Sequence, residues 1–291
     1  MPRCTLCPRK CGAVRENGEI GACHTGREIV VALAAPHHFE EPPISGQKGS
    51  GAVFFGGCSL GCIFCQNQEI SREAKGRAMT EDELGNLLLS LAEQGVHNLN
   101  LVTGTHYTDR IARVLKKIKP HLSIPVIWNS SGYENPDTLR LLEGLIDIYL
   151  PDYKYVSRDL SAALSGAPDY RETADQALLE MYRQVGPVRL GEDGMLKRGM
   201  VVRHLALPGC RRDTEAVLHA LRDLLPTSDI LLSLMRQYTP DFAPPTAPKH
   251  LLRRLTSFEY DAATALAAEL GFRGFTQGKD AASRSFTPDF S

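Results

Sequence analysis

Residues 56–67 read Gly-Gly-Cys-Ser-Leu-Gly-Cys-Ile-Phe-Cys-Gln-Asn, and this short stretch decides the fold of the chain. Cys58, Cys62 and Cys65 stand in the order C-x3-C-x2-C within one loop. Iron–sulfur clusters take thiolate ligands, and three thiolates hold only three irons of a four-iron cubane, which leaves one iron open. The glycines permit the tight turns that a loop wrapped around a cluster needs. The alternatives are three cysteines that lie close by chance, or a zinc site that lacks one ligand.

The loop resembles the signature of the radical S-adenosylmethionine (SAM) enzymes, and within them the branch related to pyruvate formate-lyase activating enzyme. The resemblance implies a [4Fe-4S] cluster whose open iron binds the amine and carboxylate of SAM. It implies that the reduced cluster passes an electron to the sulfonium and releases a 5′-deoxyadenosyl radical. It also places Phe64 beside the adenine. The resemblance covers residues 46–275, roughly.

Composition sets the broad class of the protein. The chain has 291 residues and a formal net charge of −1, so no broad nucleic-acid-binding surface is predicted. There is no apolar run long enough to span a bilayer, and the N-terminus lacks the apolar stretch of a signal peptide. Eight cysteines are many for a reducing compartment unless most of them bind metal. We therefore expect a cytoplasmic metalloprotein.

A separate cysteine-rich segment precedes the loop. Cys4, Cys7, Cys11 and Cys23 offer four thiolates, which suit tetrahedral zinc or a second iron–sulfur cluster, and the Cys-Pro-x-x-Cys-Gly turn favours zinc. A segment this short buries little core, so the metal would supply its folding free energy. The alternatives are a disulfide framework, a redox pair of Cys4 and Cys7, and His24 in place of one cysteine.

Residues 36–46 form a lead-in to the first core strand and are rich in His, Glu and Pro. The prolines argue against a helix here. The resemblance puts this lead-in near the active site, so His37, His38, Glu40 and Glu41 are candidate catalytic residues. The alternative is a solvated connector with ordinary surface charges.

From residue 51 onward, strand and helix patterns alternate. Apolar runs predict strands at 52–55, 99–102, 124–128, 146–150, 200–205 and 230–234, with a short strand at 29–33 before them. Helices are expected between them, one starting at a capping box at residues 80–83 and the last covering 250–270. Six units favour an α/β fold with a parallel sheet, and they fit the open partial (β/α)6 barrel that the resemblance to radical SAM enzymes implies. We divide the chain into the N-terminal segment 1–45, the barrel 46–275 and a C-terminal tail 276–291.

In such folds the functional side chains gather at the carboxyl ends of the strands. Asp152 and Lys154 follow the fourth strand and face the same side, so they form an opposite pair that suits a zwitterionic amino acid. The resemblance gives this pair the same roles, Asp for the ammonium and Lys for the carboxylate. The alternative is a surface salt bridge.

Three other strand ends supply further candidates. After the second strand, Gly104 matches the family's Gly-rich turn, but the acid of that turn is absent and His106 stands nearby. After the third, Asn129 matches an Asn-x-x-Gly turn and either contacts the cofactor or only shapes the turn. On the fifth, Arg203 opens an Arg-x-x-x-x-Pro-Gly pattern and is expected to support the cofactor's carboxylate or ribose.

The resemblance implies a radical SAM enzyme of the oxidoreductase type. Two classes of substrate are open for such an enzyme. One form activates a glycyl radical enzyme by taking a hydrogen atom from a backbone glycine, which requires that protein as partner and flavodoxin or ferredoxin as electron donor. Another modifies a small metabolite, a peptide or a nucleoside. A function of a different class is a regulatory module that binds zinc or a cluster without turnover.

Overall fold

The structure is a computed structural model that describes residues 3–281 and residue 290. Its strands are β1 (Ile29–His37), β2 (Ser50–Phe55), β3 (Arg77–Met79), β4 (Leu99–Val102), β5 (Val126–Ser130), β6 (Ile148–Pro151), β7 (Arg189–Leu190), β8 (Leu196–Leu205), β9 (Leu231–Met235) and β10 (Gly274–Thr276). Its α-helices are α1 (Pro42–Ser45), α2 (Gln68–Glu73), α3 (Glu81–Glu93), α4 (Thr108–Ile118), α5 (Pro136–Leu139), α6 (Arg158–Ser165), α7 (Tyr170–Val185), α8 (Arg211–Leu224) and α9 (Ser257–Glu269). Of the predicted tail, residues 282–289 and 291 lie outside the described part.

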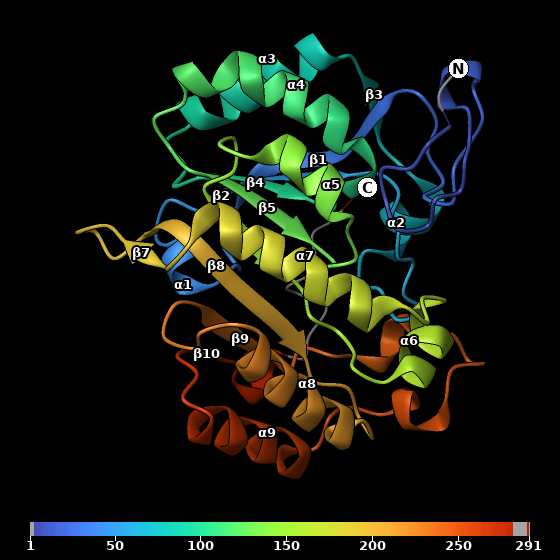
Figure 1. Ribbon diagram of the computed structural model, residues 1–291, viewed down its shortest axis with the longest axis vertical. Coiled ribbons are helices and arrows are strands. Elements are labelled where there is room, and N and C mark those ends of the chain that lie inside the picture. Colours follow the sequence, from blue (N-terminus) through green and yellow to red (C-terminus); the bar gives the residue numbers. More distant parts are fainter. Residues whose placement is uncertain (1–2, 282–289, 291) are drawn as a thin grey trace.

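The strands join in the order β10-β9-β8-β6-β5-β4-β2-β1-β3, with β7 paired to β8. Every pair from β2 to β10 along this order is parallel, whereas β1 pairs antiparallel with β2 and β3. Within the described residues the two end strands do not pair with each other, so the sheet stays open. This confirms the predicted α/β fold with a mostly parallel, partial barrel. The arrows of β5 and β8 point to the same side of the molecule (Figure 1).

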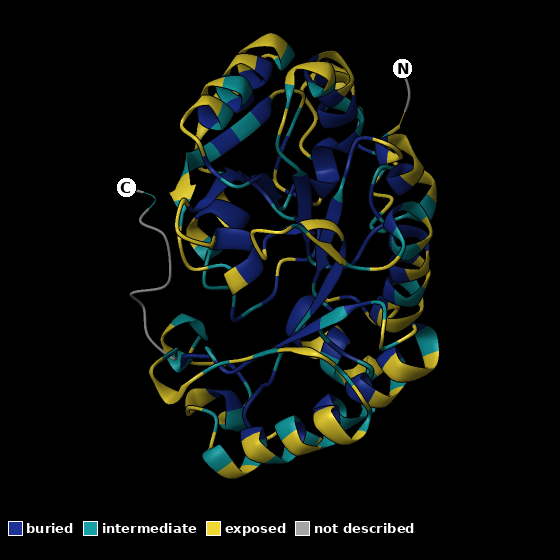
Figure 2. Ribbon diagram, turned by 90° about the vertical axis from the view of Figure 1, so that its left-hand side faces the viewer, coloured by how far each residue is buried: buried dark blue, intermediate teal, exposed yellow. Residues whose placement is uncertain are grey.

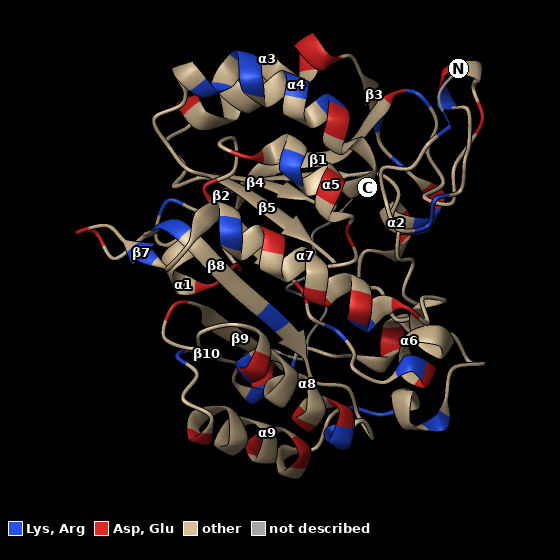
Figure 3. Cartoon of the chain, in the orientation of Figure 1, with Lys and Arg blue, Asp and Glu red and all other residues tan. Residues whose placement is uncertain are grey.

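Burial explains why the apolar runs became strands and the amphipathic runs helices. All six residues of β2 are buried, as expected for a parallel strand covered on both faces. The helices flank the buried strands and keep exposed outer faces (Figure 2). Helix α3 begins at the predicted capping box, in which Thr80 and Glu83 bond reciprocally. Acidic and basic residues are mixed along the outer helices (Figure 3), without a face of one sign over the elements drawn there.

Two predictions of secondary structure were wrong. The lead-in is not free of helix, because Pro42 occupies the first turn of α1, where a missing N–H costs nothing. The helix predicted over 250–270 is interrupted: a short 3-10 turn ends at Leu252, and α9 begins only after Thr256, which forms a capping box with Glu259. Leu252, at the end of the 3-10 turn, is 46% exposed.

Smaller differences concern element boundaries. Strand β5 ends at Ser130, two residues beyond the predicted end, so that Asn129 lies within the strand. Helix α6, which the sequence analysis did not predict, begins after Ser157 and lies between β6 and α7. In the part of the chain that the structure describes, no helix has both the length and the apolar character needed to cross a membrane.

Candidate functional site

A pocket of about 360 Å³ lies at the carboxyl ends of the parallel strands. Its walls carry all three cysteines of the loop that follows β2. They also carry Asp152 and Lys154 after β6, and residues from the ends of β4, β5, β8, β9 and β10. The rule that sites gather at the carboxyl ends of parallel strands therefore locates this pocket.

The cysteine loop is held by hydrogen bonds that point toward its sulfurs. The backbone N–H of Leu60 donates to Cys58 Sγ at 3.4 Å, and Ser165 Oγ donates to Cys62 Sγ at 3.1 Å. The N–H of Cys65 donates to the carbonyl of Cys62 at 3.2 Å, which forms the turn between the last two ligands. Gly61 has φ +65° and lies in open space, so this glycine serves the turn rather than a close contact.

The chemistry of these sulfurs fits a cluster. Burial raises the pKa of Cys58, and it raises the pKa of Cys65 to about 12, so neither is a thiolate at neutral pH without a positive partner. A bound metal supplies that charge, and donors to the sulfurs are what ligating thiolates require. Within residues 3–281 and 290, no three His, Cys, Asp or Glu side chains lie close enough together to hold one metal ion. Ligands to three different irons of a cubane lie farther apart than ligands to one ion.

Asp152 and Lys154 form an ion pair on the same wall. Lys154 Nζ lies 2.6 Å from Asp152 Oδ2, and their side chains are 18% and 22% exposed. Burial lowers the pKa of Lys154, but the carboxylate of Asp152 and the sulfur of Cys62 outweigh it and raise that pKa above its ordinary value. The pair is thus charged, inside the pocket, and not the surface salt bridge considered as an alternative.

The two glutamates of the lead-in are engaged by Arg203. Its guanidinium donates to both oxygens of Glu41 at 2.8 Å and also bonds Glu40. Burial would raise the pKa of Glu41, but Arg203 lowers it below the ordinary value. The other oxygen of Glu40 accepts from Asn100 Nδ2 at 2.8 Å and from Asn129 Nδ2 at 3.5 Å. These contacts pin the lead-in to β4, β5 and β8.

Other candidates are divided between the pocket and the core. Phe64, Asn129 and His37 line the pocket, and the ring of Phe64 meets that of Tyr238 edge-on at 6.0 Å. His38, which is exposed, does not line it.

Two candidates after β4 also lie outside the pocket lining. Gly104 packs closely against Trp128, since a Cβ at this position would lie 2.8 Å from the Trp128 ring. His106 is 1% exposed and its Nε2 bonds the carbonyl of Gly56 at 2.8 Å, beneath the cysteine loop.

Sequence reasoning missed several polar groups of the pocket. Thr103 lines it with φ +62°, a strained conformation for a β-branched residue that is found mainly at functional sites. Ser130, Ser131 and Ser233 line it as well. These four residues all stand near the carboxyl end of a predicted strand. That position was the signal in the sequence that could have identified them.

The four N-terminal cysteines lie near one another as free thiols, but no three of them are placed to hold a single metal ion. All eight cysteines of the chain are free. A Cβ placed on Gly21 would lie 3.3 Å from Cys11 Sγ and 3.4 Å from Cys23 Sγ, and the other three cysteines contribute to the raised pKa of Cys7. Burial raises the pKa of Cys7 to about 11, so it too needs a positive partner to ionise.

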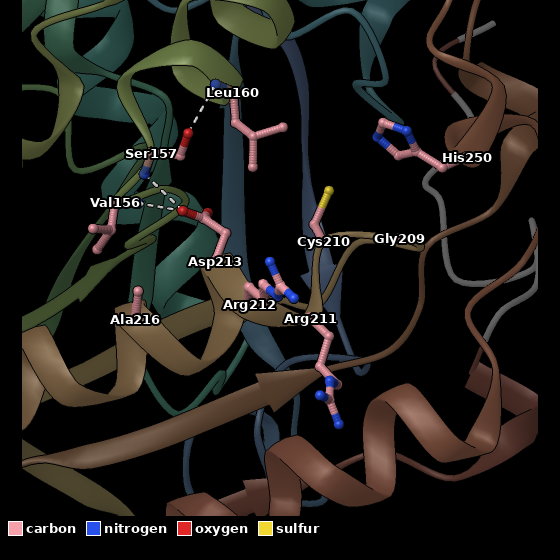
Figure 4. A pocket seen from close by; sticks show the side chains of 10 residues that line it. All are labelled: Val156, Ser157, Leu160, Gly209, Cys210, Arg211, Arg212, Asp213, Ala216 and His250. Carbon is pink, nitrogen blue, oxygen red and sulfur yellow. Dashed lines mark hydrogen bonds between the residues drawn. The ribbon is translucent and has the colours of Figure 1, made fainter.

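A second cavity, of about 700 Å³, lies beside the start of α8 (Figure 4). Asp213 in this cavity accepts hydrogen bonds from the backbone of Val156 and Ser157, drawn as dashed lines. Burial raises the pKa of Cys210 to about 11, so this lining residue is a thiol at neutral pH. The residues lining this cavity include no member of the cysteine loop and no candidate named from the sequence.

Comparison with known proteins gives three results. Residues 52–186 match the family model of the radical SAM superfamily. An uncharacterized protein of Methanocaldococcus jannaschii is 26% identical over 275 residues, which cover 91% of this chain and 74% of that protein. Two crystal structures share the fold, at TM-scores of 0.52 and 0.51: a radical SAM methyltransferase from Sphaerobacter thermophilus (17% identity, 78% of this chain) and Streptococcus suis SuiB bound to S-adenosylmethionine (13% identity, 77% of this chain). This chain spans 65% and 49% of those two proteins, less than two thirds of either.

Proposed function

We propose that this chain, whose residues 52–186 match the radical SAM family model, is an enzyme that binds a [4Fe-4S] cluster and SAM and cleaves SAM reductively. The cluster, when bound on Cys58, Cys62 and Cys65, supplies the single electron that splits the sulfonium and yields a 5′-deoxyadenosyl radical. The observation that carries the proposal is the shared pocket, in which three thiols stand beside the charged pair Asp152 and Lys154.

The charge of the pocket supports SAM as its ligand. Glu40, Glu41 and Asp152 face Lys154 and Arg203, so carboxylates exceed cations by one. Burial lowers the pKa of His37, which keeps that imidazole neutral at neutral pH. SAM carries an ammonium, a sulfonium and one carboxylate, a net charge of about +1 at neutral pH from the ordinary pKa values of its amino-acid groups. Ligand and pocket are therefore complementary in charge.

The protein's own residues bind and orient the cofactor. Asp152 accepts from its ammonium and Lys154 donates to its carboxylate, so each exchanges its present partner for the matching end of a zwitterion. Phe64, held edge-on by Tyr238, offers an aromatic surface to the adenine. Asn129 offers an amide for polar groups of the nucleoside, and Arg203 supports the wall through its glutamates.

Anaerobic reconstitution with iron and sulfide, followed by reduction with SAM present, tests the proposal. The wild-type protein should release 5′-deoxyadenosine, and Cys62→Ala should release none. The matched control is Cys210→Ala, which removes a buried thiol outside the pocket and should retain activity. No release from wild-type protein with a full complement of iron would overturn the proposal and favour a regulatory module without turnover.

We also propose a second metal on Cys4, Cys7, Cys11 and Cys23, with zinc favoured over a second cluster. Four free thiols in one short segment with little core support it, and binding would have to bring them closer together, since no three of them are placed to hold one ion in this structure. Elemental analysis of the Cys62→Ala protein isolates this site: about one zinc per chain is the amount that one structural tetrahedral site holds. Protein that contains neither zinc nor iron would contradict the second site.

The substrate we propose is a loop of a glycyl radical protein, with flavodoxin or ferredoxin as electron donor in the cytoplasm. Phe39 lies at the pocket and is 60% exposed, which suits contact with a protein partner. Transfer of deuterium from a glycine-labelled partner into 5′-deoxyadenosine would support this substrate. Transfer only from a small metabolite, a peptide or a nucleoside would replace it with the second substrate class.

A further inference from the structure

One arginine of the N-terminal segment joins the cysteine loop to the end of α6. Arg9 stands between Cys7 and Cys11, and its Nε and Nη2 donate to the carbonyls of Ser59 at 2.8 Å and Leu60 at 3.0 Å. The same guanidinium donates to the carbonyls of Ser165, at 2.7 Å, and Gly166. It also lies over the ring of Tyr133, 5.4 Å from the centroid.

The residue held by Arg9 contacts a cluster ligand. Ser165 Oγ lies 3.1 Å from Cys62 Sγ and 2.9 Å from the hydroxyl of Tyr155. Ser165 and Tyr155 are 4% and 1% exposed. A serine hydroxyl has one hydrogen, so when Ser165 donates to sulfur, Tyr155 must donate to Ser165.

A second contact links the same two parts of the chain. The N–H of Cys58 donates to the carbonyl of Cys23 at 3.2 Å. At Gly57, φ is +86° and a Cβ would lie 2.4 Å from that carbonyl, so only glycine allows this approach. The N-terminal segment therefore touches the cysteine loop through Arg9 and through Cys23.

We propose that the hydrogen bond from Ser165 to Cys62 raises the reduction potential of the cluster bound by the loop, and that Arg9 is a positioning residue that keeps Ser165 in place. This inference rests on the proposed function, since it concerns the cluster held by the same loop. One-electron reduction, by flavodoxin, ferredoxin or dithionite, adds negative charge shared by the thiolate sulfurs, and a hydrogen bond to a sulfur stabilises the more negative state. The N-terminal cysteine segment thereby tunes the pocket in which SAM is cleaved.

The test compares midpoint potentials of the reconstituted protein, read from the EPR signal of the reduced cluster at set potentials. Ser165→Ala should lower the equilibrium constant for reduction about tenfold, which for one electron is a shift of about 60 mV to more negative potential. Tyr155→Phe should shift it less, in the same direction. The matched control is Ser161→Ala, a buried serine of α6 whose hydroxyl donates to the carbonyl of Arg158. Equal potentials for Ser165→Ala and Ser161→Ala would overturn the inference.

Arg9→Gln tests the positioning role. It should shift the potential in the same direction as Ser165→Ala, whereas Lys10→Gln, the same change of charge at an exposed neighbour, should not. A shift with Ser165→Ala but none with Arg9→Gln would overturn the role of Arg9. Wild-type protein that cleaves no SAM would contradict the proposed function, whereas active variants with an unchanged reduction potential would contradict only the roles of Ser165 and Arg9.

Discussion

Replacing Arg203 with methionine should destabilise the fold strongly. Arg203 is the cation between Glu40 and Glu41, and the three side chains are 14%, 8% and 6% exposed. Arg203→Met keeps much of the side-chain volume but leaves two buried carboxylates without their cation. Breaking a buried pair in this way costs about 3–5 kcal/mol. For a chain of this size that corresponds to a fall in Tm of roughly 10 °C.

The pH dependence of the defect identifies its cause. In the wild-type protein Arg203 lowers the pKa of Glu41 and outweighs the effect of burial. In the variant only burial is left, which raises this pKa, so the folded variant binds a proton at Glu41 more tightly than the unfolded chain does. Stability of the variant should then rise as pH falls from 8 to 5, and the deficit relative to wild type should shrink. Urea unfolding of wild type, Arg203→Met and the double variant Arg203→Met/Glu41→Gln measures this, and the double variant should recover part of the loss.

The control for a lost arginine is Arg189→Met, at an exposed position of β7. Its effect should stay within about 0.5 kcal/mol. If Arg203→Met were as stable as Arg189→Met at pH 8, the two glutamates would not depend on Arg203 and the account of this wall of the pocket would be wrong.

Three further predictions concern the buried Glu134, the turn at Gly132, and Lys154 in the pocket. Burial raises the pKa of Glu134 to about 7, so the folded state favours the protonated form of this carboxyl group. The free energy of unfolding of the wild-type protein should therefore fall by on the order of 3 kcal/mol as pH rises from 5 to 8. Urea unfolding of Glu134→Gln should not show this fall. Gly132→Ala, at φ +72°, would place a Cβ 2.2 Å from the carbonyl of Asp152 and should weaken SAM binding, measured by calorimetry. Gly144→Ala, at φ +75° in open space, should cost only about 1–2 kcal/mol and leave binding unchanged, so equal binding by both variants would contradict the role of this turn. Lys154→Met should weaken SAM binding about tenfold or more through loss of a charge-assisted hydrogen bond, and unchanged binding would exclude Lys154 as the carboxylate partner.

Local pattern was enough to predict the fold class and the centre of the pocket. The three cysteines of the loop lie within eight residues, so their spacing can be read directly from the sequence. The apolar runs that form β2 and β4 are continuous because both faces of a parallel strand are buried. The rule that sites gather at strand ends then selected Asp152 and Lys154, which the structure brings together in the pocket.

Local pattern could not reveal partners that lie far away along the chain. Glu40 and Glu41 are candidate catalytic residues by their position, and only the structure shows that Arg203, more than 160 positions away, binds both. The start of the last helix is set by an N-cap at Thr256, which the apolar periodicity of the predicted helix over 250–270 did not reveal.

By itself, the sequence determined which atoms are available to bind a cluster and a zwitterion, because ligand spacing and strand periodicity are properties of neighbouring residues. Only the tertiary structure decided which charges neutralise one another and which donor reaches which sulfur. The bonds from Arg9 to Ser165 and from Ser165 to Cys62 join segments more than 100 residues apart. Such contacts depend on how the folded chain packs, and no local spacing encodes them.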